Sequence, residues 1–337
     1  MKVFIITEGG KNIGFGHITR CLSLYQAFEE RGTLLKFIIN GDNNIEYLLK
    51  DVNYQIFNWL DERNKLFEIV KNADIAIIDS YLADISVYNT LSELVKLSVY
   101  VDDNKRLNYP KGIVVNGNIY AKELDYPKRD GIVYFLGPKY IPLRKEFWKV
   151  PEKKIKEEIE SIMVTFGGND TRKLTPQILN LLSKNYPNLK KNVIIGKAFK
   201  NIDEIKKESD KNTYLVYYPD AEKMKYIMLE SDIAISSGGQ TLHELARVGV
   251  PTIGICVAEN EIRTVEGWKN AGFLEYVGWH LGEDLMEKLK NSVKYLKSMN
   301  VRKNKSKIGK TFIDGKGTLR IHSVLKESLN ENPVSFK

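Results

Sequence analysis

The stretch VFIITEGGKNIGFGHITRCL, residues 3–22, joins a short apolar run to a glycine-rich turn and the start of a helix. This order is typical of a strand–turn–helix unit in a parallel sheet. Glycines in the turn allow the backbone to approach a ligand closely, and free N–H groups at the helix start face that ligand. The spacing does not fit a dinucleotide site, because Thr19 stands where the third glycine is required. NAD is therefore not expected.

The alternation of strands and helices continues through the chain. Short β-branched runs predict strands at residues 2–7, 34–39, 74–79, 97–101, 113–115, 161–166, 192–195, 213–217, 233–236 and 251–256. Longer periodic stretches predict helices at residues 17–31, 173–185, 220–230, 240–248 and 261–271. Strands separated by helices form parallel sheets with right-handed crossovers. The predicted class is α/β, with two doubly wound Rossmann-like domains facing a central cleft.

A segment rich in proline and glycine separates the two halves. It reads GPKYIPL from Gly137, and Pro151 follows. Such a segment is too rich in ring-locked residues to continue either sheet. We therefore predict a first domain at 1–145, a linker at 146–157 and a second domain at 158–337. The last helix is expected at residue 317 to about 329, and in related folds such a helix crosses back onto the first domain.

The composition predicts a folded, water-soluble chain. Its 337 residues include 51 basic and 43 acidic side chains, which gives a net charge of +8, and 43% are hydrophobic. Cys21 and Cys256 are too few and too isolated for a disulfide framework or a zinc cluster. No apolar run approaches the ~18 residues of a membrane span, and the first is too short for a signal peptide. We expect a cytoplasmic protein without a membrane span.

A cluster of basic residues stands out near the end of the chain. It lacks the interleaved aromatic residues typical of nucleic-acid binding. We therefore expect a solvated surface and no nucleic-acid partner, with an acidic partner as the alternative. The cluster consists of Arg302, Lys303, Lys305, Lys307 and Lys310.

His17 is the candidate catalytic base. It stands at a helix start, where the positive end of the helix dipole disfavours imidazolium and is expected to keep the ring neutral near pH 7. A neutral imidazole can accept a proton from water or a hydroxyl. The alternative is a helix-cap histidine bonded to backbone.

A second glycine turn follows the strand at 233–236 and opens a helix with SGGQTLHE from Ser237. Its amides, with Gln240 and Thr241, can hold a diphosphate. Glu244 lies one turn into the helix, where its carboxylate can accept hydrogen bonds from a ribose diol, or else can complete a capping box.

Four further loops carry polar groups at predicted strand ends. Asn260 can reach a sugar or cap a helix, and Asp170 in the turn 166–170 can be an N-cap. Asp102 and Asp103 must point opposite ways, so at most one faces the cleft. The fourth loop reads Asp79-Ser80-Tyr81. No D-x-D motif occurs, so we expect no metal and no cofactor, with phosphate charge held by amides and helix termini.

These motifs together resemble the UDP-2,4-diacetamido-2,4,6-trideoxy-β-L-altropyranose hydrolases of pseudaminic acid biosynthesis, within the wider group of spore coat polysaccharide proteins. The segments that carry the resemblance are GFGHITRCL from Gly14, FGGND from Phe166, SGGQTLHE from Ser237, the Asn260 loop and DGKGTLR from Asp314. The resemblance spans nearly the whole chain. It implies the metal-independent, two-domain GT-B fold of glycosyltransferases such as the peptidoglycan transferase MurG.

The resemblance also implies roles for individual residues. His17 matches the base that activates water to attack the anomeric carbon with inversion, and Asn260 and Tyr81 match active-site residues. The first domain then binds the sugar and the second binds UDP. The residues expected to contact the substrate are Gly14, Gly16, Arg20, Gly168, Asn169, Gly238, Gly239, Gln240, Thr241, Glu244 and Glu261.

Two positions depart from the family pattern. Glu261 stands where the family has glutamine, and Asn169 where it usually has serine. Both departures fall where the sugar is expected to be recognised, so the nucleotide part of the interpretation is firmer than the identity of the sugar.

Two other functions remain open on the residues alone. A glycosyltransferase of the same fold would use His17 to deprotonate an acceptor hydroxyl. A nucleotide-sugar-binding protein without catalysis would bind UDP and tolerate loss of His17. The oligomeric state is not fixed by the sequence, and a monomer is expected.

Overall fold

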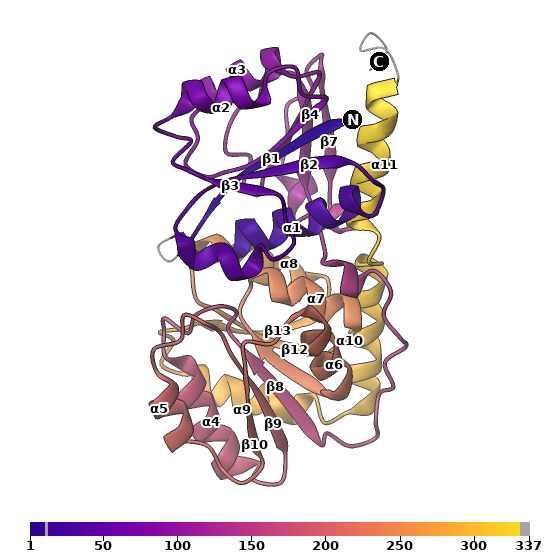
Figure 1. Ribbon diagram of the computed structural model, residues 1–337. Coiled ribbons are helices and arrows are strands. Elements are labelled where there is room, and N and C mark those ends of the chain that lie inside the picture. The colour runs from indigo at the N-terminus through magenta and orange to yellow at the C-terminus, as the bar shows by residue number, and fades with distance from the viewer. Residues whose placement is uncertain (11–12, 331–337) are drawn as a thin grey trace. The chain divides into compact units, whose positions relative to one another are not determined.

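The computed structural model describes residues 1–10 and 13–330, which form two compact units (Figure 1). The first unit contains Met1–Lys145 together with the segment from Lys316 onward, and the second contains Glu146–Gly315. The segment 146–157, expected as a linker, thus groups with the second unit. The last helix groups with the first.

The first unit is built on a parallel sheet in the order β3-β2-β1-β4-β5-β6-β7. Its strands are β1 (Lys2–Gly9), β2 (Leu34–Gly41), β3 (Tyr54–Ile56), β4 (Ile75–Asp79), β5 (Leu97–Val101), β6 (Gly112–Asn116) and β7 (Ile132–Leu136). The strand order reverses direction between β1 and β4, where Ile5 pairs with Ile77. Open α/β sheets bind ligands at the carboxyl ends of the strands beside such a switch point.

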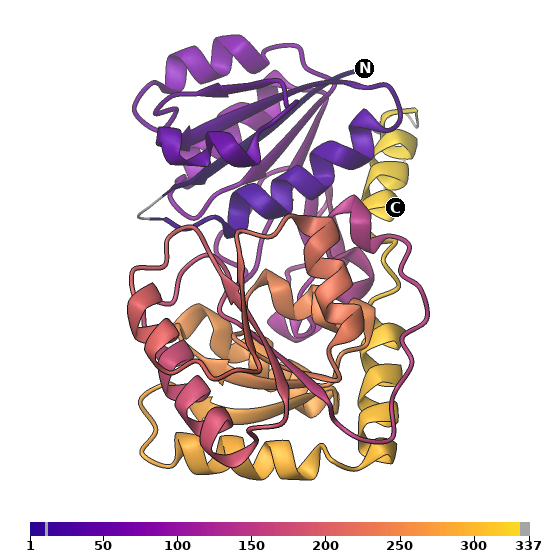
Figure 2. The same cartoon turned by 60° about the horizontal axis from the view of Figure 1, so that its bottom comes forward.

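Helices cover both faces of this sheet because successive residues of β1 point to opposite sides. Val3 and Ile5 pack in the cluster that includes residues of α1 and α11, whereas Phe4 and Ile6 pack in the cluster that includes residues of α2 and α3. Helices α1 and α11 lie side by side (Figures 1 and 2). The helices are α1 (Gly16–Glu29), α2 (Arg63–Val70), α3 (Ile85–Leu94) and α11 (Gly317–Asn330), with 3-10 helices η1 (Asn43–Leu48), η2 (Ala121–Leu124) and η3 (Pro138–Tyr140).

The second unit has its own parallel sheet in the order β10-β9-β8-β11-β12-β13. Its strands are β8 (Ser161–Thr165), β9 (Lys190–Ile195), β10 (Thr213–Tyr217), β11 (Ile233–Ser236), β12 (Thr252–Cys256) and β13 (Leu274–Trp279). The switch point lies between β8 and β11, where Ile235 pairs with Val164. The predicted α/β class with two doubly wound, Rossmann-like sheets is confirmed.

Local sequence signals set the ends of the second unit's helices. Helix α6 begins after Asp220, whose carboxylate accepts a hydrogen bond from the Lys223 amide, and α7 ends at Gly249 in the left-handed conformation (φ 80°). The helices are α4 (Leu174–Asn185), α5 (Ile202–Lys207), α6 (Ala221–Glu230), α7 (Gln240–Val248), α8 (Ile262–Asn270), α9 (Leu285–Tyr295) and α10 (Met299–Phe312). The 3-10 helices are η4 (Lys145–Phe147) and η5 (Glu259–Glu261), of which η4 begins one residue before this unit. In the described part of the chain, no helix has the length and apolar character needed to span a bilayer.

Candidate active site

Three side chains meet at the carboxyl edge of the first sheet, beside its switch point. His17 follows β1 at the start of α1, Asp79 is the last residue of β4, and Asp103 lies just after β5. Strands β1, β4 and β5 are neighbours and parallel, so their carboxyl ends fall at one edge. The fold therefore brings together residues that are distant in the chain, with 86 positions between His17 and Asp103 (103 − 17).

His17 is held by a buried carboxylate. Its Nδ1 lies 2.7 Å from Oδ1 of Asp79, whose side chain is fully buried. With Nδ1–H donating to Asp79, Nε2 is the ring nitrogen left to accept a proton. Burial lowers the pKa of His17, but the Asp79 carboxylate raises it by more, and the net pKa lies above the ordinary value.

The sequence predicted that the helix start keeps His17 neutral, but the net effect of the surroundings is to raise the pKa of His17. Helix α1 does begin beside His17, but the paired carboxylate outweighs the helix dipole because it is a full charge in hydrogen-bond contact. The helix-cap alternative also fails, because the ring bonds Asp79 and the N-cap of α1 is Phe15, with no side-chain cap.

Arg20 clamps the two carboxylates of this site. Its Nε donates to Oδ2 of Asp79 at 2.9 Å and its Nη2 to Oδ1 at 2.7 Å, while its Nη1 donates to Oδ1 of Asp103 at 2.6 Å. Burial opposes the charged forms of both acids, but the guanidinium lowers the pKa of each below its ordinary value. Arg20, predicted to contact substrate, thus directs these donors to protein carboxylates and positions the site.

Tyr81 completes the group. Its hydroxyl donates to Oδ2 of Asp103 at 2.5 Å, and its ring stands edge-on to His17 with centroids 4.5 Å apart. The loop that carries it is fixed by the buried carboxylate of Glu8, which accepts the Tyr81 amide at 2.6 Å and the Ser80 hydroxyl. Burial and then Asp103 raise the pKa of Tyr81, so it is a neutral hydrogen-bond donor.

Asp102 and Asp103 point to different surroundings, as predicted. Asp102 is buried and accepts hydrogen bonds from the hydroxyls of Tyr109 and Tyr126. Asp103 instead faces Arg20, Tyr81 and the Asn118 amide, at 2.8 Å from the last. Only Asp103 belongs to the candidate site.

The first glycine turn is closed by its own backbone. The amide of Gly14 donates to the Gly10 carbonyl at 2.8 Å, and the Gly10 amide returns a bond to Gly14 at 3.0 Å. The Gly14 amide is therefore engaged within the turn. A side chain added at Gly14 or Gly16 would meet no atom within 4 Å, so the space beside both glycines is open in the described chain.

The second unit presents two turns at its own switch point, one after β8 and one after β11. In the first, Asp170 accepts the amides of Leu174 and Thr175, each at 2.9 Å. The N-cap of α4 is Lys173, so the predicted N-cap role of Asp170 is wrong, although its carboxylate does bond the first two amides of the helix. Asn169 and Gly168 lie exposed beside it. In the second, Gly239 is the N-cap of α7 and has no side chain, so Gln240 and Thr241 begin the helix.

Glu261 lies against the second turn instead of standing free. Its carboxylate accepts the Val257 amide at 3.1 Å and is also bonded by the Gly238 amide. The Cβ of Glu261 lies 2.9 Å from the position that a Cβ on Gly238 would take. Burial raises the pKa of Glu261, and the hydrogen bonds from the Val257 and Gly238 amides make its side chain a brace for the loop.

The remaining predicted residues differ in exposure. Asn260 lies in η5 with an exposed side chain, and the N-cap of α8 is Glu261, so the helix-cap alternative for Asn260 does not hold. Glu244 is only 2% exposed within α7.

The predicted site residues omitted Glu8, Asp79, Asp103 and Asn118. Asp79 has a visible signal in the sequence, since an acid ends the otherwise apolar run of β4 at a ligand-binding sheet edge. Its pairing with His17 needs the register of β1 against β4, which the sequence does not supply. In the described chain, no group of three or more His, Cys, Asp or Glu side chains is placed to hold a metal ion.

The chain is similar in sequence to several known proteins. Residues 161–313 match the glycosyltransferase family 28 C-terminal domain. The spore coat polysaccharide biosynthesis protein SpsG of Bacillus subtilis is 24% identical over 341 residues, 97% of this chain and 98% of that protein. The UDP-2,4-diacetamido-2,4,6-trideoxy-β-L-altropyranose hydrolase of Campylobacter jejuni is 25% identical over 289 residues, 82% of this chain and 99% of that protein.

Other similarities concern length and fold. The protein MJ1062 of Methanocaldococcus jannaschii is 28% identical over 278 residues, which span 78% of this chain but only 57% of that protein. The crystal structure of MurG from Acinetobacter baumannii has a TM-score of 0.68 at 12% identity, covering 97% of this chain and 100% of that one. The similarity to MurG establishes the GT-B fold.

Proposed function

We propose that this chain, which belongs to the GT-B group that includes SpsG and the UDP-diacetamido-sugar hydrolases, cleaves a UDP-linked 2,4-diacetamido-2,4,6-trideoxyhexose to UDP and free sugar. The His17–Asp79 pair beside the switch point of the first sheet carries the proposal, because it supplies a positioned base of raised basicity. The free sugar would serve the biosynthesis of a nonulosonic acid such as pseudaminic acid, or of a surface polysaccharide.

In the proposed reaction, Nε2 of His17 takes a proton from water as the water oxygen attacks the anomeric carbon. The bond between that carbon and the β-phosphate oxygen breaks, and its electron pair leaves with UDP. Asp79 stabilises the imidazolium that forms, as a buried carboxylate does beside a general base. Tyr81 stands edge-on to the ring and can donate a hydrogen bond to the sugar when it releases Asp103.

The second unit is proposed to hold the nucleotide. Amides at the start of α7, with Gln240 and Thr241, would bind the diphosphate and stabilise the charge that grows on UDP as it leaves. Glu244 is proposed to accept hydrogen bonds from the ribose. Asn260, exposed in η5, and Asn169, exposed after β8, would contact the sugar.

The test is UDP release from UDP-diacetamido sugars in H₂¹⁸O without any acceptor. We expect ¹⁸O in the sugar, because water attacks carbon and not phosphorus. His17→Ala should lower turnover by about 10²- to 10⁴-fold, the usual contribution of a general base. Its UDP dissociation constant should stay within a few-fold, whereas Glu244→Ala should weaken UDP binding.

Thr19→Ala is the matched control, because Thr19 lies two residues from His17 and its hydroxyl donates to the Phe15 carbonyl of the same helix end. It should retain turnover. UDP release only after addition of a hydroxyl acceptor would favour the glycosyltransferase alternative, which the match to the glycosyltransferase family 28 C-terminal domain also supports. UDP binding with no turnover, unchanged in His17→Ala, would establish a binding protein.

A further inference from the structure

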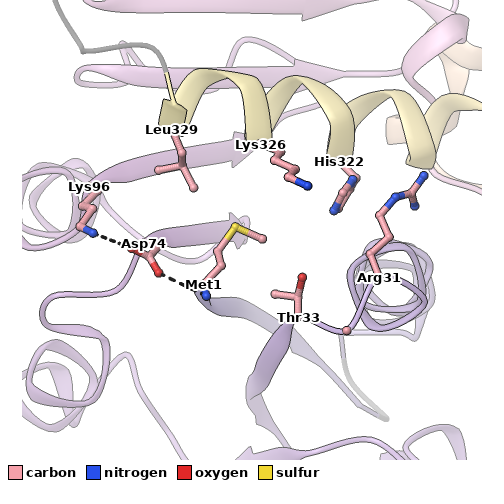
Figure 3. A pocket seen from close by; sticks show the side chains of 9 residues that line it. Met1, Arg31, Thr33, Asp74, Lys96, His322, Lys326 and Leu329 are labelled. Carbon is pink, nitrogen blue, oxygen red and sulfur yellow. Dashed lines mark hydrogen bonds and ion pairs between the residues drawn. The ribbon is translucent and has the colours of Figure 1, made fainter.

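A cavity opens at the edge of the first sheet opposite to the His17 site, where the strands begin (Figure 3). Its volume is about 490 Å³, within the usual range of small-molecule sites. The wall on the sheet side consists of residues that directly precede strands β1, β2, β4 and β5, namely Met1, Thr33, Asp74 and Lys96. Helix α11 and Arg31 form the other wall. Because the His17 site lies at the carboxyl edge, a length of β1 away, a ligand here would be separate from the proposed substrate.

His322 projects from α11 toward this cavity with an unsatisfied ring nitrogen (Figure 3). The residue is only 3% exposed, and its Nδ1 has no hydrogen-bond partner in the described part of the chain. The ring is fixed edge-on against Phe28, with centroids 4.8 Å apart. A buried polar atom without a partner is costly, so a ligand that bonds to Nδ1 would remove a real penalty.

The charges around His322 select for an anion. Burial, then Arg31 and Lys326, lower the pKa of His322 to about 4, so the ring is neutral and can donate one N–H. Asp74 is the acid among the lining residues, and it is already bonded by Lys96 at 2.7 Å and by the Lys2 amide at 2.7 Å. Among the described residues, Arg31 and Lys326 make no ion pair, so two positive charges remain for a ligand.

We propose that this cavity binds the phosphoryl group of a small molecule, with Arg31, Lys326 and His322 as its three donors. A phosphoryl group presents three or more oxygens, which matches three separate donors better than the two oxygens of a carboxylate. The apolar side chains of Met1 and Leu329 also line the cavity, and they provide a surface for an organic part. Free phosphate and a phosphorylated metabolite share this chemistry.

The experiment follows the ring signals of the four histidines by NMR in the full chain, labelled at histidine and saturated with UDP so that added phosphate does not bind at a nucleotide site. The probes are inorganic phosphate, a hexose 6-phosphate and acetate. His322→Gln assigns the His322 signal, and Lys326→Gln, at an exposed position, tests the site without disturbing the core. Lys128→Gln, also exposed in the first unit, makes the same change of charge elsewhere.

We expect phosphate to shift the His322 signal saturably. Lys326→Gln should weaken phosphate binding about fivefold, because it removes one partly exposed, charge-assisted hydrogen bond. Lys128→Gln should leave phosphate binding unchanged. Tighter binding of the hexose phosphate would identify a metabolite as the source, and equal binding would identify free phosphate. A His322 signal that does not respond to either phosphate, a response equal in Lys326→Gln, or acetate binding as tight as phosphate would each overturn the proposal.

Discussion

Asp79 organises the candidate site because its one buried carboxylate bonds both His17 and Arg20. It holds His17 at 2.7 Å and receives two hydrogen bonds from Arg20. His17 was predicted from its position at a helix start after a strand, and Tyr81 from the resemblance to the hydrolase family. The sequence did not predict the acid between them, because the contact joins residues 62 positions apart.

The Asp79–His17 pair makes a prediction about pH. A general base must be unprotonated, so kcat/KM should rise with pH through the pKa of His17, which lies above its ordinary ~6.5. Asp79→Asn removes the carboxylate that raises this pKa. The midpoint of the pH–rate profile and the His17 NMR titration should both move to lower pH in that variant, and turnover should fall as the ring loses its orientation.

Stability should change with pH in the opposite sense to activity. The pKa of His17 is higher in the folded chain than in the unfolded one, so its contribution is fully present below ~6.5 and is lost as pH rises through the folded pKa. Asp103→Asn is the comparison variant: Asp103 raises the pKa of His17 only through its charge and not through a hydrogen bond, so that pKa should fall less than in Asp79→Asn. An unchanged His17 titration in Asp79→Asn would contradict this account of the site.

The basic cluster near residue 305 shows where residue type alone misleads. Arg302 is fully buried and donates to three backbone carbonyls at 2.7–3.0 Å, and Lys305 is 6% exposed and pairs with Glu275 at 2.5 Å. Two of the five predicted surface cations are thus internal. Their long side chains reach the backbone carbonyls of Lys156, Glu157 and Gly272, which are distant in the sequence, and no local pattern encodes that pairing.

Several helices and strands with apolar periodicity were predicted closely, but α9 was missed although it buries Leu285, Leu289 and Val293 at helical spacing. The strand predictions at 97–101, 213–217 and 233–236 match β5, β10 and β11. Helix α10 was missed because its buried face contains Arg302, Lys305 and Ser306, so polar residues occupy the stripe that periodicity detects as apolar.

The turn before α7 gives a matched pair of glycine substitutions. A Cβ on Gly238 would lie 2.8 Å from Cγ1 of Val265, whereas one on Gly239 would have its nearest neighbour at 3.8 Å. Gly238→Ala should therefore lower the free energy of unfolding by about 1–3 kcal/mol, and Gly239→Ala should change it little. Denaturant unfolding measures both.

The same pair tests whether the turn holds a diphosphate. If phosphate oxygens approach the backbone at the start of α7, the new methyl of Gly239→Ala should weaken UDP binding at least several-fold with stability intact. Calorimetric titration with UDP measures this. A Gly239→Ala variant with full UDP affinity would place the nucleotide elsewhere in the second unit.

The chain returns to its first unit after completing its second. Ile321 and Leu325 of α11 are buried in the same cluster as Phe28 of α1, about 300 positions earlier in the sequence. Periodicity predicted the helix, but its partner could only be suggested, because an amphipathic helix specifies an apolar contact and not which sheet supplies it.

This return predicts which unit a distant substitution destabilises. Leu325 in α11 and Leu289 in α9 are both fully buried, in the clusters of the first and second unit respectively. Truncation of each to alanine should cost about 2–5 kcal/mol in its own unit.

In scanning calorimetry, UDP should raise the transition temperature of the second unit, since a ligand stabilises the unit that binds it. Leu289→Ala should lower that UDP-sensitive transition, whereas Leu325→Ala, although later in the sequence, should lower the other. A Leu325→Ala variant that lowers only the UDP-sensitive transition would show that α11 belongs energetically to the second unit.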